Sequence, residues 1–310
     1  MIFLTFPLTF WIWALAIIPG SWRLAIGRVL GSLIRLVSPR IAVIDSNLEI
    51  AFPGDGKGSV LKRARLRDET YVHLANLIIE TLFLLGPMKW FTKSRVSVDG
   101  FSHLVRAMDK GKGAIFLASH MGNWEIMAAR GGLQMGNLLM VTKKLKPKWF
   151  HKWVEWGRNR CGVNGTYEPK TLRDILAQIK KGGLVGIVLD QYAGPPIGIR
   201  VPFFGLPVGT HSVVATLVKR TGAAVVPVFC RRLDDGSHQI EVGPEIPWTE
   251  DSNASREIAL NTAHYSSIIE SEILRTPEQW LWMHRRFKGD LSPLKPTEWE
   301  RFRLRRGLSD

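Results

Sequence analysis

The sequence predicts an α/β fold in which a largely parallel central sheet is flanked by helices, with a hydrophobic anchor helix at the N-terminus. Short apolar runs of strand length alternate with segments of helix length, the order typical of parallel sheets. The first 18 residues contain no charged side chain. At 310 residues, the chain is long enough to bury a large core in one big domain or two modest ones.

The elements follow in a regular order. A charged segment with helical character, residues 59–85, comes before the alternation. The apolar runs expected to form buried strands are residues 114–119, 138–141, 184–189 and 224–229. The helices expected between and after them are residues 124–133, 147–160, 170–181, 212–221 and 253–275.

Composition narrows the class of protein. The formal net charge is +15, yet 45% of the residues are hydrophobic, which argues against disorder. Twelve Trp against four Tyr suit a membrane interface better than a nucleic-acid surface, so membrane lipids are expected partners and nucleic acid is not. Cys161 and Cys230 form no CxxC pair, and no metal or cofactor is expected. The positive charge is concentrated in residues 1–40, 143–160 and 284–310.

The N-terminal apolar run predicts a membrane anchor. Eighteen helical residues rise about 27 Å, slightly less than a hydrocarbon core of about 30 Å, so the segment either spans with local thinning or lies partly embedded. The alternative is a cleaved signal peptide, because residues 14–16 resemble a cleavage site, but no basic residue precedes the run. The positive charges all follow it, which places the main body in the cytoplasm. The expected organisation is an anchor with its basic flank at 1–40, a globular domain at 41–289 and a basic tail at 290–310.

The strongest chemical signal follows the run at 114–119. His120 is expected in a strand-to-helix turn formed by Gly122 and Asn123, with Glu125 in the first helical turn. A carboxylate on one imidazole nitrogen fixes the tautomer and leaves the other nitrogen as a general base. A histidine satisfied within a loop is the alternative on geometry alone. The chain has neither an HExxH zinc motif nor a G-x-S-x-G nucleophile elbow.

These residues resemble a known family. His120-x4-Glu125 is similar to the H-x4-D/E signature of the glycerolipid acyltransferase superfamily, and the surrounding sequence resembles the bacterial lipid A biosynthesis (lauroyl/myristoyl) acyltransferases. The further matches are residues 47–53 (NLEIAFP), 190–191 (DQ), 201–205 (VPFFG), 226–228 (VPV) and 277–288 (PEQWLWMHRRFK). The family commonly has Asp where this chain has Tyr192.

The resemblance implies a glycerolipid acyltransferase-like fold and an activity. It implies transfer of a fatty acyl chain from acyl carrier protein to a hydroxyl of a lipid A precursor, at the cytoplasmic face of the bacterial inner membrane. His120 would remove the acceptor proton and Glu125 would orient His120. A thioester is reactive enough for direct attack by the hydroxyl, so no protein nucleophile and no cofactor are required.

Eight further residues are candidates for substrate binding. Each has a structural alternative: a member of a basic run, a turn residue, a packing residue or a solvated helix end. The candidates are Arg158, for the acceptor phosphate or the thioester; Asp190 and Gln191, at the end of a buried strand; Phe203, Phe204 and Gly205, for the lipid chain; and Arg285 and Arg286, for lipid phosphates.

Residues 143–160 carry a second pattern. Trp149, Trp153 and Trp156 share one helix face among lysines, which indicates either a core-facing stripe or interfacial seating on anionic lipid. An acidic carrier protein would also favour basic patches. Two rival functions remain open: a phospholipid-pathway acyltransferase with a glycerol phosphate acceptor, and a catalytically silent basic protein that binds membranes.

Overall fold

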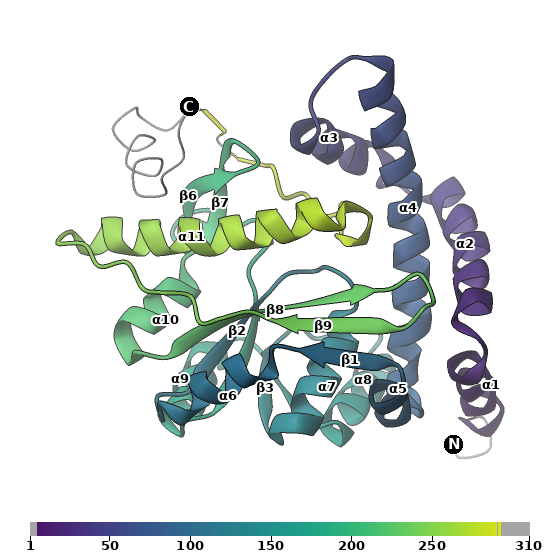
Figure 1. Ribbon diagram of the computed structural model, residues 1–310, viewed down its shortest axis with the longest axis horizontal. Helices are drawn as coiled ribbons and strands as arrows, with labels where there is room; N and C mark the ends of the chain where they lie inside the picture. The colour runs from purple at the N-terminus through teal and green to yellow at the C-terminus, as the bar shows by residue number, and fades with distance from the viewer. Residues whose placement is uncertain (1–4, 290, 293–310) are drawn as a thin grey trace.

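The protein is described by a computed structural model that covers residues 5–289, 291 and 292. Its centre is a seven-stranded sheet in the order β1-β9-β8-β2-β5-β3-β4, with helices on both faces (Figure 1). Neighbouring strands are parallel except for β8 and β9. The strands are β1 Val96–Asp99, β2 Ala114–Ala118, β3 Leu138–Val141, β4 Val163–Thr166, β5 Leu184–Val188, β8 Ala224–Arg232 and β9 His238–Val242. The predicted α/β class with a largely parallel sheet is confirmed.

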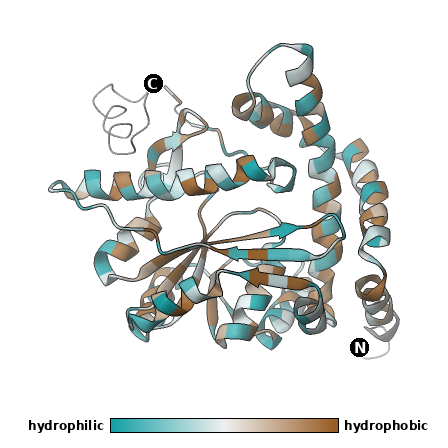
Figure 2. Cartoon of the chain, in the orientation of Figure 1, coloured by the Kyte–Doolittle hydropathy of each residue, from teal (hydrophilic) through white to brown (hydrophobic). Residues whose placement is uncertain are grey.

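The two faces of the sheet bury separate apolar cores. Along β2, Phe116 and its even-numbered neighbours point to one core, while Ile115 and Leu117 point to the other, as strand alternation requires. The hydropathy colours show the central strands as mostly apolar (Figure 2). The helices of the first face are α1 Thr5–Ile17, η2 Leu82–Leu85, α5 Met88–Ser94, α6 Phe101–Asp109, α7 Trp124–Met135 and α8 Lys148–Arg160. Those that pack on the second face include α3 Ile41–Ala51, α9 Thr171–Lys180, α10 Val213–Thr221 and α11 Ala254–Arg275.

Helix α4 (Lys57–Thr81) stands at one end of the sheet and contributes to both cores, with α2 (Gly20–Val37) packed along it. A short antiparallel hairpin, β6 Gly198–Phe203 and β7 Leu206–His211, lies beyond α11 in Figure 1. The chain returns to the sheet after α11 through η3 Pro277–Gln279.

A topological switch point lies between β2 and β5. The chain leaves β2 through α7, on the first face, whereas the connection from β5 to β8 passes through the hairpin and α10, on the second face. Both strands are parallel, so their carboxyl ends share one edge of the sheet. Ligands in open α/β sheets bind at such a point, which places the functional site after Ala118 and Val188.

The expected N-terminal helix is present as α1, and its role as an anchor stays a prediction. Helix α1 ends at Ile17 and meets α2 at a bend of 118°. Within the described residues, no single helix is both long and apolar enough to cross a bilayer; two bent pairs pass that test jointly, Leu8–Ile17 with Gly20–Val37 and Lys57–Leu85 with Met88–Ser94. Helix α1 also buries Ile12 and Ala16 in the first core, so its inner face belongs to the domain.

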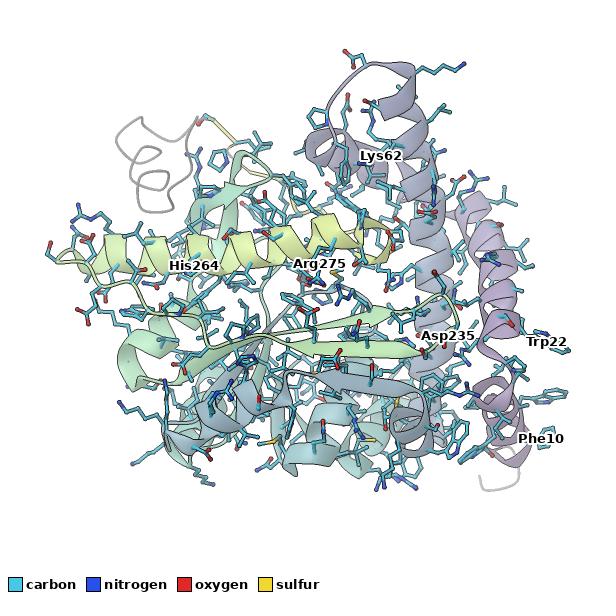
Figure 3. All side chains as sticks on the ribbon, viewed as in Figure 1. Phe10, Trp22, Lys62, Asp235, His264 and Arg275 are labelled. Carbon is cyan, nitrogen blue, oxygen red and sulfur yellow. The ribbon has the colours of Figure 1, made fainter. Side chains whose placement is uncertain are left out.

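The outer face of the N-terminal helices is apolar and exposed. Phe10 and Trp22 project away from the body (Figure 3), and their exposed fractions are 62% and 67%. Trp11 is exposed to the same degree. The division of the chain at residues 40 and 289 stays a prediction, and the basic tail at 290–310 lies outside the described residues except for residues 291 and 292.

Most of the expected strands and helices are present, with ends that differ by a few residues. Strand β8 is three residues longer than expected, because it continues to Arg232 to pair with β9. The elements that were not expected are α2, α3, α5, α6, β1, β4, β9 and the β6–β7 hairpin.

Candidate active site

The turn after β2 is shaped by two residues that the sequence singles out. Gly122 has φ of +55°, and a side chain there would overlap the carbonyl oxygen of Cys230 in β8. Asn123 caps α7, because its Oδ1 accepts from the backbone N–H groups of Glu125 (3.1 Å) and Ile126 (3.0 Å). The expected strand-to-helix turn is confirmed, and it holds His120 at the switch point.

His120 is paired with Asp190, two residues beyond β5. The ring Nδ1 lies 2.8 Å from Asp190 Oδ1, and the backbone N–H of His120 donates to Oδ2 at 2.7 Å. A carboxylate only accepts hydrogen bonds, so Nδ1 carries the proton and Nε2 keeps its lone pair. The His120 side chain is 21% exposed and Asp190 is buried, so Nε2 is the half of the pair that a substrate can reach.

The environment keeps Asp190 ionised. Burial alone would raise its pKa, but the electrostatic interaction with His120 and the hydrogen bonds from His120 and Trp280 outweigh burial, and the pKa of the carboxyl lies below its ordinary value. An ionised Asp190 stabilises the imidazolium that forms when Nε2 takes a proton. The pair therefore has the arrangement of a general base with its orienting carboxylate.

Gln191 lies directly beside the base. Its Nε2 is 3.3 Å from His120 Nε2 and 3.5 Å from Nδ1, so the amide lies over the imidazole ring. The backbone carbonyl of Gln191 accepts a hydrogen bond from Arg286, so its backbone is held while its amide faces the imidazole. Trp124 packs edge-on against the His120 ring, with centroids 5.0 Å apart. The place of Gln191 fits the expected contact with substrate, which stays a prediction.

The structure does not show the expected contact between Glu125 and His120. Glu125 lies in the first turn of α7, as predicted, but its two carboxylate oxygens accept from Arg158, one from Nε at 2.9 Å and the other from Nη2. The remaining Nη1 of Arg158 lies 3.3 Å from Thr142 Oγ1. Helical geometry explains the difference, because the side chain of Glu125 points toward α8 instead of back along the turn. Asp190 is the carboxylate that orients His120.

The same ion pair corrects the expectation for Arg158. Its side chain is 7% exposed and its nitrogens are bonded to Glu125 and Thr142, so no phosphate reaches it directly. Glu125 and Arg158 instead join α7 to α8 next to the site. Charge-assisted bidentate pairs of this kind fix geometry as well as contributing energy.

A second buried ionic cluster lies behind the turn. Glu80 of α4 accepts from the side chains of Asn123 (2.9 Å) and Arg232 (2.9 and 2.6 Å), and His73 and His238 surround it. Burial raises the pKa of Glu80 less than Arg232 and His238 lower it, so Glu80 remains ionised. Because Asn123 is the N-cap of α7, this cluster fixes the start of the helix that follows His120.

Arg286 is also corrected from a lipid-phosphate contact to a structural one. Its guanidinium is buried and donates to the carbonyl oxygens of Gln191 (3.2 Å) and Gly209 (2.6 Å) and to Thr210 Oγ1 (2.6 Å). It therefore braces the loop that contains Asp190 and Gln191. Arg285 is exposed, and its expected contact with phosphate stays a prediction.

The VPFFG segment forms the end of the β6–β7 hairpin. Phe203 is buried and packs near Trp280 and Phe287, which favours a packing role over direct lining of a lipid site. Phe204 and Gly205 have φ of +49° and +73° and make the tight turn between β6 and β7. Gly205 is exposed at the tip.

The tryptophan stripe of α8 faces outward at its two ends. Trp149 and Trp156 are 58% and 48% exposed, while Val154 and Gly157 bury the opposite side. Gly157 packs closely on η2, which also contacts α1, so α1 and α8 flank the same short segment. This arrangement favours an interfacial stripe over a core-facing one. Across the described residues, no group of three or more His, Cys, Asp or Glu side chains is placed to hold a metal.

Sequence reasoning missed the partner of His120 and the role of Trp280, which donates to Asp190. The position of Asp190 at the end of a predicted parallel strand was a usable signal, because carboxyl ends of such strands meet at one edge. Trp280 gave no local signal, since only the fold brings residue 280 to residue 190.

The chain is similar to several known acyltransferases. The family profile described as bacterial lipid A biosynthesis acyltransferase matches residues 1–289. The lipid A biosynthesis palmitoleoyltransferase of Escherichia coli K12 is 30% identical, over 90% of this chain and 88% of its own length. The lipid A biosynthesis lauroyltransferase of the same organism is 27% identical, over 87% and 86%. The crystal structure of a 1-acyl-sn-glycerophosphate acyltransferase from Thermotoga maritima is 17% identical and covers 84% of this chain and 99% of its own, with a TM-score of 0.41.

Proposed function

The chain belongs to the bacterial lipid A biosynthesis acyltransferase family, and from that premise we propose that it moves a fatty acyl chain from acyl carrier protein to a hydroxyl of a lipid A precursor. The observation that carries the mechanism is the His120–Asp190 pair, with Nε2 of His120 left reachable at the switch point. Family membership supports acyl transfer to lipid A. The carrier-protein donor and the cytoplasmic face of the inner membrane are parts of the proposal.

His120 acts as the general base. Nε2 takes the proton of the acceptor hydroxyl as its oxygen attacks the thioester carbonyl, and a carbon–oxygen bond forms. The tetrahedral intermediate then collapses, the carbon–sulfur bond breaks, and the imidazolium returns the proton to the leaving sulfur. Asp190 holds Nδ1–H throughout and stabilises the transient imidazolium.

Gln191 is the nearest donor to the reacting atoms. Its amide Nε2 is 3.3 Å from His120 Nε2 and 3.5 Å from Nδ1, so the amide lies over the ring and leaves the lone pair of Nε2 open to the acceptor hydroxyl. In the proposed mechanism this amide N–H donates to the carbonyl oxygen that becomes negative. A donor aimed at such an oxygen is a common source of transition-state stabilisation in acyl transfer.

The acceptor is tested by a direct choice between two lipids. Purified protein with acyl carrier protein thioester should acylate a phosphorylated disaccharide lipid that carries free hydroxyacyl chains, and should leave lysophosphatidic acid unmodified. Mass spectrometry of both products decides. Efficient transfer to lysophosphatidic acid alone would contradict the lipid A acceptor and support a phospholipid-pathway enzyme.

Membrane seating in this proposal uses the exposed faces of α1, α2 and α8. Apolar side chains are exposed on α1 and α2, and tryptophans among lysines are exposed on α8; both α1 and α8 contact η2. Aromatic rings at the headgroup level and lysines beside anionic phosphates both favour binding to a bilayer surface. The protein should therefore bind phosphatidylglycerol vesicles more tightly than phosphatidylcholine vesicles.

Two matched pairs of variants test this seating by vesicle sedimentation. Trp11→Ser with Trp22→Ser should weaken binding at every salt concentration, whereas Leu172→Ser with Ile197→Ser, equally exposed elsewhere, should not. Lys148→Glu with Lys152→Glu should weaken binding mainly at low salt, relative to Lys180→Glu with Lys181→Glu at the C-terminal end of α9. Equal loss in a pair and its control would contradict a defined membrane face.

A further inference from the structure

The chain that follows α11 returns to the active site and brackets His120 with backbone hydrogen bonds. The carbonyl oxygen of Gln279 accepts from Gly122 N–H at 2.9 Å, and Leu281 N–H donates to the carbonyl oxygen of His120 at 3.0 Å. An isolated antiparallel bridge between Met121 and Trp280 lies between these two bonds. Residues far apart in the sequence are therefore held in register around the catalytic turn, and the side chain of Trp280 is placed beside Asp190.

Trp280 completes the set of donors around Asp190. Its indole Nε1–H donates to Asp190 Oδ2 at 2.7 Å, on the same oxygen that accepts from the backbone of His120. Oδ1 faces the Nδ1 of His120 at 2.8 Å. Two of these three donors thus come from His120 itself, and the indole attaches the carboxylate to the rest of the protein.

Burial makes the loss of this hydrogen bond costly. Trp280 is 1% exposed and Asp190 is 3% exposed, so water does not replace the indole donor when the bond is broken. The indole is itself immobilised, because it packs against two other aromatic rings. The distance between ring centroids is 4.6 Å to Trp282 and 6.0 Å to Phe203. A rigid donor on a buried carboxylate fixes the plane in which that carboxylate meets the imidazole.

We propose that Trp280 is a positioning residue for acyl transfer, which holds the Asp190 carboxylate in the orientation that presents Nε2 of His120 to the acceptor hydroxyl. The proposal rests on the function of His120 as the base. Without the indole donor, Oδ2 keeps one hydrogen bond, the carboxylate gains rotational freedom, and the imidazole loses its fixed direction. Trp280 then affects the chemical step without touching substrate.

The loss also has an electrostatic consequence. The Trp280 hydrogen bond is one of the causes that lower the pKa of Asp190, so its removal makes the carboxylate a stronger base and favours the protonated pair. The other charged or titratable groups around the pair are His284, whose pKa is lowered mainly by burial, Arg286 and Lys288. None of these is altered by a substitution that keeps position 280 aromatic.

Trp282 supplies a matched control. It is also fully buried in the same aromatic cluster, and its indole N–H also donates a hydrogen bond, but to the backbone carbonyl of Pro277 at 2.6 Å. Trp280→Phe and Trp282→Phe therefore remove the same atoms from neighbouring sites, and both should lower the melting temperature to a similar extent. They differ in whether Asp190 loses a donor.

The experiment compares turnover and its pH dependence in the two folded variants. In Trp280→Phe, kcat should fall about tenfold with KM within about twofold, the loss expected for one buried hydrogen bond to a charged group. The acidic limb of its pH–rate profile should move to higher pH by about half a unit, because the protonated pair is favoured. Trp282→Phe should keep kcat within about twofold and the acidic limb unchanged. Equal behaviour of the two variants would overturn the proposal.

A second measurement does not depend on turnover. In spectra of protein labelled with 15N-histidine, the Nδ1 proton of His120, assigned by its absence in His120→Gln, should exchange with water faster in Trp280→Phe than in Trp282→Phe. If exchange in Trp280→Phe were unchanged, the positioning role of Trp280 would be rejected, whichever acyl donor and acceptor the protein uses. If exchange were faster in Trp280→Phe but the wild type transferred no acyl chain, only the proposed function would be contradicted.

Discussion

Two buried carboxylates lie on either side of the turn after β2, and they differ in what they hold. Asp190 faces His120, whose side chain is 21% exposed, and this histidine can gain or lose a proton. Glu125 faces an arginine that is 7% exposed and stays charged at every pH of interest. The first centre is able to exchange a proton with a substrate, whereas the second one is a fixed ion pair between two helices.

The difference shows that distance along the chain is a poor guide to partnership at a switch point. Glu125 is five residues from His120 but points to α8, while Asp190 is seventy residues away and lies at hydrogen-bond distance. Neighbouring parallel strands bring Asp190 to His120, because β2 and β5 end at the same edge. The following predictions test whether the His120–Asp190 pair serves catalysis and the Glu125–Arg158 pair serves stability.

His120→Ala should give the largest loss of activity. Removing the general base should lower single-turnover acyl transfer by about 10²–10⁴, which corresponds to roughly 3–5 kcal/mol of transition-state stabilisation. The melting temperature should change little, because the ring is partly exposed. Near-normal transfer by folded His120→Ala would show that the histidine is a structural loop residue.

Glu125→Ala should act on stability first. It leaves Arg158 charged and unpaired in a buried site, and the expected loss is about 3–5 kcal/mol in the free energy of unfolding, measured by urea denaturation. The double variant Glu125→Leu with Arg158→Met removes both charges and should recover most of that loss. If the double variant were stable but as inactive as His120→Ala, the ion pair would have a chemical role and the comparison would fail.

Asp190→Asn should reduce turnover by about 10², less than His120→Ala, because the base remains but its tautomer and orientation are no longer fixed. Combined with His120→Ala it should cost little more than His120→Ala alone, since residues that act as one unit are not additive. Single-turnover rates of the three folded variants measure this. Additive losses would mean that Asp190 acts separately from His120.

A third centre, around Glu80, should affect the pH dependence of stability and not turnover. Burial and the charge of Arg232 hold the pKa of His73 well below its ordinary value, and burial lowers that of His238. Below about pH 6.5 the unfolded chain takes up protons that the folded protein does not, so the free energy of unfolding should fall by about 1.4 kcal/mol per pH unit for each histidine.

His73→Gln provides the check on that slope, because glutamine retains an acceptor for Arg232 but does not titrate. The free energy of unfolding of this variant is measured between pH 7.5 and pH 5.5. It should decline less steeply than that of the wild type, by the contribution of one histidine, about 1.4 kcal/mol per pH unit. An identical slope would mean that His73 is protonated in the folded state.

The sequence predicted those parts of the fold that depend on local pattern. The apolar runs at β2 and β8 are almost entirely buried, and those at β3 and β5 are buried or half-buried, so they need no alternation with polar residues to be recognised. Strand β4, with the sequence VNGT, is short and partly polar at the sheet edge, and β9 pairs with β8 only because the chain reverses at Asp235. Such elements form through their neighbours, so periodicity alone does not predict them.

The candidate site also has parts that local sequence predicts and parts that it does not. The turn around His120 was predictable because Gly122 and Asn123 are local signals. The partners of Asp190, Arg158 and Arg286 were not, because each is selected by contacts across 33 to 95 residues of sequence. Arg158 and Arg286, both assigned to phosphate contacts from the sequence, are buried as internal braces, where hydrogen bonds to carbonyl and carboxylate oxygens compensate the cost of burial.

The position of Gly122 limits which substitutions the protein can accept there. No other residue fits at position 122, because the backbone angle is left-handed and the space of a Cβ atom is filled by the Cys230 carbonyl. Gly136 is also left-handed, but open space surrounds it, so a replacement there meets only backbone strain. In a library of all single substitutions selected for function, we expect position 122 to tolerate no change and position 136 to accept several. The mutational tolerance of a glycine would then report how closely two backbones approach beneath the catalytic turn.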